Sequence, residues 1–177
     1  FSDWCELPPL YSLIRLWSRP GPIGRCIPGR GMTGFPCIHR DEVVRFVRRV
    51  IEKNDTLDRH EVLFASEDGC TCHDDLFRPI RRLGGQNVSA GPIHVPPPLA
   101  VLFLYLKLAA NGLLFRQTYE QPWMLTYADR PLRVDTSRTR QTLDWRPRNE
   151  YGILNRLPVL MANFQNHRRY WRARNIL

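Results

Sequence analysis

A run of three glycines provides the first spacing in this sequence that could do chemistry. Residues 29–34 (GRGMTG) match the pattern G-x-G-x-x-G, with which some strand-to-helix turns hold a dinucleotide pyrophosphate. That pattern works only where a strand precedes it and a helix follows it, because the helix N-terminus meets the phosphates. Here Pro28 precedes it, and Phe35 and Pro36 follow where the helix should continue. We therefore expect a flexible loop at this point and no cofactor site.

Cysteines and histidines form a second candidate group. Cys70, Cys72 and His73 lie close together, and Cys37 and His39 lie upstream, so a zinc site can be assembled on paper. Structural zinc sites usually contain two cysteines separated by two to four residues, and a separation of one is tighter than that. Helix capping and core packing explain these residues more simply, so we expect no metal.

The number of cysteines indicates the cellular compartment in which we expect the protein. The chain has five cysteines, an odd number, and its first residues show no basic stretch followed by an apolar run. Both observations argue against a disulfide framework in a secreted protein. We expect reduced thiols and a cytoplasmic location. The chain also opens on Phe1 without a cap or polar lead, so we expect it to be a piece of a longer protein.

The charge of the chain favours an anionic partner. There are 26 Lys and Arg against 17 Asp and Glu, a net charge of +9, and Lys occurs only at Lys53 and Lys107. Arginine suits bidentate contact with phosphate, so a nucleotide diphosphate, a nucleic acid or an anionic membrane would fit. The 43% of hydrophobic residues argues against wholesale disorder.

Two segments could contact a membrane or a nucleic acid. The apolar run 99–115 is interrupted by Lys107 and Asn111 and is shorter than the roughly 20 residues of a membrane span, which predicts a buried or half-buried helix. A helix on a membrane surface is the alternative. The stretch 167–174 mixes arginines with Tyr170 and Trp171 and could bind nucleic acid, but we favour an amphipathic helix or a domain interface.

Hydrophobic periodicity and turn residues predict strands that alternate with helices, which is typical of an α/β fold. We expect helices at 8–19, 41–52, 74–83, 99–114 and 136–143, strands at 62–65, 93–95 and 132–134, and a kinked or broken helix at 150–164 with Pro158 inside it. The strand at 62–65 should be buried. Thr71 and Asp74 match a capping box for the third helix, and Gly84 and Gly85 should end it.

Three segments, in this order, resemble the carboxyl-terminal half of the NAD-dependent epimerase/dehydratase family, within the extended short-chain dehydrogenases/reductases. Segment 34–44 (GFPCIHRDEVV) resembles the family's Y-I-H-V-D-D-L/V, where a strand end runs into a helix. Segment 62–76 (VLFASEDGCTCHDDL) is similar to its strand followed by a capped helix. Segment 134–147 (VDTSRTRQTLDWRP) looks like its x-D-T/A-S-K-A-x-x-x-L-G-W-x-P.

The resemblance implies a partial Rossmann-type fold, with the last strands of the sheet and a mostly helical substrate lobe. Residues 1–164 would form this part, and 165–177 a basic aromatic tail. NAD or NADP would be held by a cofactor lobe that this chain lacks, together with the family's Tyr-x-x-x-Lys pair, which does not occur here. The resemblance thus implies no catalytic, cofactor-binding or metal-binding residue in this chain, which should be inactive alone.

The resemblance also implies a substrate, namely a small molecule with a hydroxyl or carbonyl group or a nucleotide-linked one. Asp3 and Trp4 would form the floor of the substrate pocket. His39 would either line this pocket or be a buried histidine that bonds to the backbone. Arg40 and Arg130 would meet a phosphate or be solvated. Contact with the missing lobe is expected, and a homo-oligomer is compatible with this reading.

A second hypothesis, from another class, explains the same charge. The chain would be a non-catalytic basic module on a dehydrogenase-like scaffold, which binds nucleic acid or anionic lipid in a salt-sensitive way. Nucleic acid is a partner that we do not favour, and we expect no transmembrane span.

Overall fold

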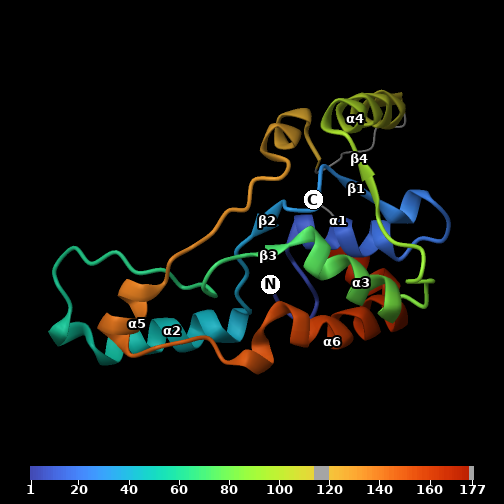
Figure 1. Cartoon of the computed structure of the whole chain (residues 1–177). Coiled ribbons are helices and arrows are strands. Elements are labelled where there is room, and N and C mark those ends of the chain that lie inside the picture. Colours follow the sequence, from blue (N-terminus) through green and yellow to red (C-terminus); the bar gives the residue numbers. More distant parts are fainter. Residues whose placement is uncertain (114–119, 176–177) are drawn as a thin grey trace.

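The computed structural model of this chain describes residues 1–113 and 120–175. It is a mixed α/β protein, mostly helical, with a small parallel sheet (Figure 1). The longer helices are α1 (Pro8–Trp17), α2 (Arg40–Glu52), α3 (His73–Leu83), α4 (Pro97–Leu113), α5 (Ser137–Leu143), α6 (Ile153–Asn166) and α7 (Arg168–Asn175). The single-turn helices are η1 (Ile23–Arg25), η2 (Asn54–Thr56), η3 (Pro122–Tyr127) and η4 (Asn149–Tyr151), and the strands are β1 (Cys26–Pro28), β2 (Gly34–Phe35), β3 (Thr71–Cys72) and β4 (Ile93–Val95).

The strands form two small sheets. β1 pairs with β4 in parallel, with Ile27 opposite His94, and β2 pairs with β3 in antiparallel, with Gly34 opposite Cys72. An isolated bridge joins Gly69 to Val134. The strand predicted at 93–95 is confirmed as β4, but the strand predicted at 132–134 does not form, and Val134 makes only the isolated bridge to Gly69.

The core lies between α1, α3 and α6, and α7 closes it. Its largest fully buried side chains are Trp17, Trp171, Phe77, Leu10, Ile14, Ile27, Leu76, Ile80, Ile153, Leu157 and Leu160. The predicted apolar faces of α1 and α3 are confirmed, because the spacing of their apolar residues at three and four brings them onto one side of each helix. Trp171 in the core ties the basic tail to the rest of the fold.

A second layer extends from this core along α2 and α5, which lie side by side (Figure 1). Arg49 Nε donates to the Leu143 carbonyl at 2.8 Å, and the rings of Phe46 and Trp145 meet edge to face at 5.1 Å. Glu42, fully buried near the start of α2, accepts hydrogen bonds from Arg45 and Arg148. The layer is therefore held mainly by charged and aromatic contacts.

Three further expectations about secondary structure were wrong. No buried strand forms at 62–65: Val62 is 73% exposed, and the Thr139 hydroxyl, not a neighbouring strand, bonds to both backbone groups of Phe64. The capping box of α3 lies one residue later than predicted, with Cys72 as N-cap and the Asp75 carboxylate accepting from the Cys72 N–H at 2.9 Å. Helix α6 is not broken but runs from Ile153 to Asn166 with Pro158 inside it.

The long apolar helix forms as predicted, but it is not buried as predicted. Leu104 is buried, whereas the neighbouring large side chains of α4 are about half exposed. The predicted end of this helix at Leu114 lies outside the described residues. Among the helices that the structure describes, none is both long and apolar enough to traverse a bilayer.

Candidate functional site

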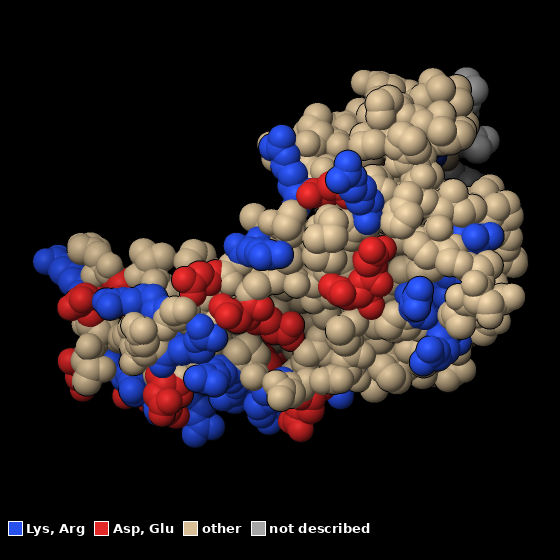
Figure 2. Space-filling view, in the orientation of Figure 1, with Lys and Arg blue, Asp and Glu red and all other residues tan. Residues whose placement is uncertain are grey.

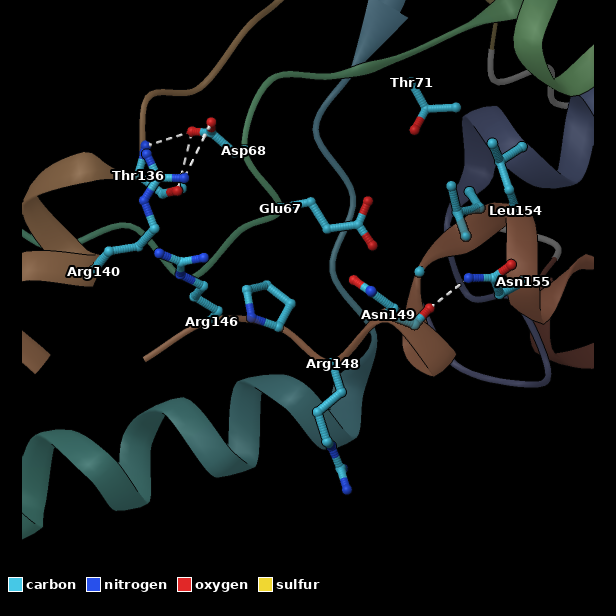
Figure 3. Close-up of a pocket in the computed structure, with 13 residues that line it drawn as sticks. Glu67, Asp68, Thr71, Thr136, Arg140, Arg146, Arg148, Asn149, Leu154 and Asn155 are labelled. Atoms are coloured by element: carbon cyan, nitrogen blue, oxygen red, sulfur yellow. Dashed lines mark hydrogen bonds and ion pairs between the residues drawn. The ribbon is translucent and has the colours of Figure 1, made fainter. Parts of the chain in front are cut away.

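A shallow cleft of about 430 Å³ opens at the N-terminus of α6 (Figure 3). One wall is the loop that carries Glu67 and Asp68, and the other is the segment 146–155 that leads into α6. α5 contributes Arg140 at one end of the cleft. Three stretches far apart in the sequence therefore supply its lining.

Glu67 reaches into the middle of this cleft (Figure 3). Its carboxyl group accepts a hydrogen bond from the backbone N–H of Ile153, in the first turn of α6. Burial raises the pKa of Glu67 above its usual value, and this hydrogen bond opposes the shift. Glu67 therefore holds its proton to a higher pH than an exposed glutamate does.

Asp68 and Arg140 form one end of the cleft. Asp68 Oδ1 accepts from the Thr136 N–H at 3.0 Å and from its hydroxyl at 3.1 Å, and Arg140 Nη1 donates to Asp68 Oδ2 at 3.3 Å. The hydrogen bonds from Thr136 are the main cause of the lowered pKa of Asp68, so this carboxylate is ionised and fixes the arginine.

Asparagine and arginine side chains also line the cleft, beside the apolar Pro147, Ile153 and Leu154. Asn155 Nδ2 donates to the Asn149 carbonyl at 2.7 Å, which orders the turn before α6. Arg146 is exposed and reaches toward the Asp68 end of the cleft (Figure 3). Arginine, amide and carboxyl groups can together recognise a small ligand that carries hydroxyl or carbonyl oxygens and an anionic group.

Two of the residues predicted to bind substrate lie together behind this cleft. His39 is 2% exposed, and its Nε2 lies 3.4 Å from Asp3 Oδ1. His39 Nδ1 accepts from the Asp41 N–H, which makes His39 the N-cap of α2 and leaves the ring proton on Nε2. Burial lowers the pKa of His39, and the Asp3 carboxylate opposes this shift. The histidine is therefore buried and backbone-bonded.

The side chain of Tyr151 connects this buried pair to the cleft. Tyr151 contacts the His39 ring at a centroid distance of 4.9 Å, and Arg156 lies over Tyr151 while its Nε donates to Asp3 Oδ1 at 2.9 Å. The same turn, η4, carries Asn149 into the cleft. Asp3 and His39 thus support one wall of the cleft from its far side.

The other three predicted residues do not join them. The Trp4 ring packs edge to face on Tyr170 at 4.7 Å. Arg40 is exposed beside Asp41, and Arg130 follows η3, where its guanidinium lies over Tyr127. The structure therefore brings Asp3 and His39 together and leaves Trp4, Arg40 and Arg130 at separate places.

The glycine-rich loop is already occupied by a carboxylate of the chain itself. Asp129 Oδ1 accepts from the Arg30 N–H at 2.6 Å and from the Met32 N–H at 3.3 Å. Gly29 and Gly31 have positive φ angles of 70° and 83°, which suit this close approach, and strand β2 follows instead of a helix. The loop binds an internal anion where the fingerprint would bind a pyrophosphate.

Cys70 and Cys72 flank Gly34 on the neighbouring strand, so that a Cβ at position 34 would lie 2.8 Å and 3.0 Å from their sulfur atoms. Burial raises the pKa of Cys72 to about 11. Across residues 1–113 and 120–175 no three His, Cys, Asp or Glu side chains gather as a metal site would require. These thiols therefore pack against the backbone of β2.

Sequence reasoning missed the residues that line the cleft, namely Glu67, Arg140, Arg146, Asn149 and Asn155. It gave Glu67 no partner in the fold. The sequence feature that could have identified them is their position within or beside the second and third resembling segments. Glu67 lies in segment 62–76, and Arg140 and Arg146 lie in segment 134–147.

Comparisons with known proteins bear on the fold alone. No family model and no curated protein sequence matches this chain. Its structure is similar to the crystal structure of gox2253, with a TM-score of 0.54 and 14% sequence identity. The likeness covers 91% of this chain and 44% of the other, so this chain spans less than half the length of that neighbour.

Proposed function

We propose that this chain is the substrate-side part of an NAD(P)-dependent dehydrogenase, reductase or epimerase of the extended short-chain family, and that the cleft at α6 is part of its substrate site. In this proposal the fold is a partial Rossmann-type fold, and the nicotinamide cofactor is held by another lobe. The chain contributes recognition of the substrate and carries no catalytic group.

The observation that carries this proposal is the meeting of the three resembling segments. β2 of the first segment pairs with β3 of the second, and Gly69 of the second bridges to Val134 of the third. The Asp68–Thr136 hydrogen bonds close the contact at the edge of the cleft. The second and third segments thus line one concave site, and the first segment pairs with the second beside it, which supports a common functional origin.

The occupied glycine loop supports the assignment of the cofactor to another lobe. Because the Asp129 carboxylate already satisfies the N–H groups of Arg30 and Met32, a pyrophosphate at this loop would have to displace it. A likeness that covers most of this chain but 44% of gox2253 also fits one lobe of a larger fold. Neither observation identifies a substrate.

The cleft favours a small ligand with both an anionic group and neutral oxygens. Arg146 and Arg140 supply the positive charge, and the carboxyl group of Glu67 supplies a polar group near the centre of the cleft. These groups would orient a hydroxyl or carbonyl carbon toward hydride chemistry that the bound nicotinamide supplies. The role of this chain is to bind and position.

Saturation-transfer NMR with a panel of 2-hydroxy acids, 2-keto acids, polyols and nucleotide sugars tests this proposal. We expect at least one anionic member to bind, and Arg146→Ala to weaken it about tenfold through loss of a charge-assisted contact. Arg168→Ala, an exposed arginine of α7 outside the cleft, is the matched control and should leave binding unchanged. Equal loss in both variants, or no binding by any member, contradicts the proposal.

A further inference from the structure

Helix α4 exposes apolar side chains that a helix of its composition should bury. Lys107 is the one charged residue among its 17, and the exposed large side chains are Leu99, Leu102, Phe103, Tyr105 and Leu106, each 42–58% exposed. A helix that is apolar around most of its circumference is normally found in a core or a lipid environment. The exposure of α4 therefore calls for an apolar partner.

The single-turn helix η3 extends the same surface with aromatic residues. η3 packs against α4, and both stand at one end of the molecule (Figure 1). Trp123 is 61% exposed and Tyr127 is 55% exposed, with their rings 6.3 Å apart. Tryptophan and tyrosine with exposed rings are enriched where a protein meets the headgroup level of a membrane. We call α4 and η3 together the α4–η3 arm.

Basic side chains gather where this arm joins the body. Figure 2 shows an almost uncharged end of the molecule over α4, with lysine and arginine side chains below it. Arg130 and Arg133 are exposed directly after η3, and Leu132 between them is 64% exposed. An apolar and aromatic tip above a basic rim is complementary to a bilayer whose headgroups are anionic.

From these observations we propose that the α4–η3 arm docks on the surface of a bilayer that contains anionic lipid. α4 lies in the plane of the surface with Phe103 and Leu106 in the acyl boundary, and Arg130 and Arg133 contact lipid phosphates. A helix of 17 residues is about 25 Å long, which is too short to cross the membrane with its flanks. This inference is independent of the ligand of the cleft.

The charge distribution favours lipid over a second copy of the chain. A symmetric dimer through the arm would bring the two basic rims of a protein of net charge +9 toward each other. The headgroups of an anionic bilayer would instead attract these positive charges. Binding should therefore depend on both anionic lipid and low ionic strength.

Co-sedimentation with vesicles of phosphatidylcholine alone and of phosphatidylcholine with 30% phosphatidylglycerol tests the inference. We expect binding to the anionic vesicles, weak binding to the neutral ones, and a decrease in added salt. Phe103→Ser with Leu106→Ser should weaken binding at least tenfold. Arg130→Gln with Arg133→Gln should weaken it about tenfold on anionic vesicles alone.

Val44→Ser with Ile51→Ser is the matched control, because these α2 residues are 65% and 69% exposed and lie outside the arm. We expect less than a twofold change, and circular dichroism should show all variants folded. Equal binding by wild type and the Phe103–Leu106 variant overturns the inference. So does concentration-dependent dimerisation, lost in that variant, with no binding to anionic vesicles.

Discussion

Arg148 and Glu42 are joined by two hydrogen bonds across 106 residues of sequence. Arg148 Nε donates to Glu42 Oε1 at 2.7 Å, and the Arg148 backbone N–H donates to Glu42 Oε2 at 3.1 Å. The glutamate side chain is 1% exposed. This buried carboxylate fastens the turn that leads into the cleft to the start of α2.

Glu42→Gln should therefore destabilise the fold. The amide keeps the shape but leaves the guanidinium groups of Arg45 and Arg148 without their anion, and we expect a loss of about 2 kcal/mol in the free energy of unfolding. Urea unfolding followed by fluorescence measures it. Glu52→Gln, which removes exposed ion pairs of the same helix, should cost much less, because solvent screens them. Equal effects of the two changes would refute a special role for Glu42.

Arg81 should be a stabilising residue with no part in binding. It is 3% exposed, and its guanidinium donates to the carbonyls of Trp17, the last residue of α1, and Gly24 in η1. Arg81→Met leaves these carbonyls buried without a donor, and we expect a loss of about 3 kcal/mol. The neighbouring Arg82→Met, at an exposed position, should change stability by less than about 0.5 kcal/mol.

His73 should make the protein sensitive to mild acid. Burial lowers its pKa from 6.5 to about 4, and its Nδ1 has no hydrogen-bond partner between the rings of Trp17 and Phe35. The unfolded chain therefore binds this proton more tightly, so the contribution is intact above pH 6.5 and declines as pH falls toward 4.

His73→Phe should reduce that decline, because the phenyl ring fills the same space without a group to protonate. Melting temperatures at pH 7 and pH 4.5 give the comparison between variant and wild type. The prediction fails if the His73 ring resonances titrate in NMR near pH 6.5.

Glu67 should make stability depend on pH in the direction opposite to that of His73. Its folded-state pKa is raised by burial, so the folded protein binds the proton more tightly, and stability falls as pH rises through the interval between the unfolded and folded values. Glu67→Gln removes this fall while keeping an oxygen for the Ile153 N–H. We expect the variant to gain in melting temperature relative to wild type between pH 4 and pH 7, and a growing deficit would contradict the assigned pKa direction.

The elements that periodicity encodes were predictable, and the contacts between elements were not. Leu76, Phe77 and Ile80 are spaced so that a helix must bring them to one face, and that face is buried. The apolar run at Val62 carries no such information, since short apolar runs suit strands, helices and loops alike. Its backbone is satisfied by the Thr139 side chain, which no local pattern reveals.

The same distinction applies to the site. The resemblance assigned Asp3 and His39 to one substrate pocket, and the structure places these two side chains in contact. The cleft depends on Glu67 meeting the first turn of α6, a tertiary contact over 86 residues that no local pattern indicates. The exposure of α4 was also unpredictable, because an apolar pattern indicates a need for burial and does not say against what.

The location of the cofactor is the most direct test of the proposed enzyme. NADPH fluorescence should be measured with this chain alone and with any longer protein that its gene encodes, here called the extended protein. We expect no binding by the chain alone, and binding by the extended protein together with turnover that Arg146→Ala reduces. Binding of NADPH by the chain alone, or its absence from the extended protein, would contradict the account.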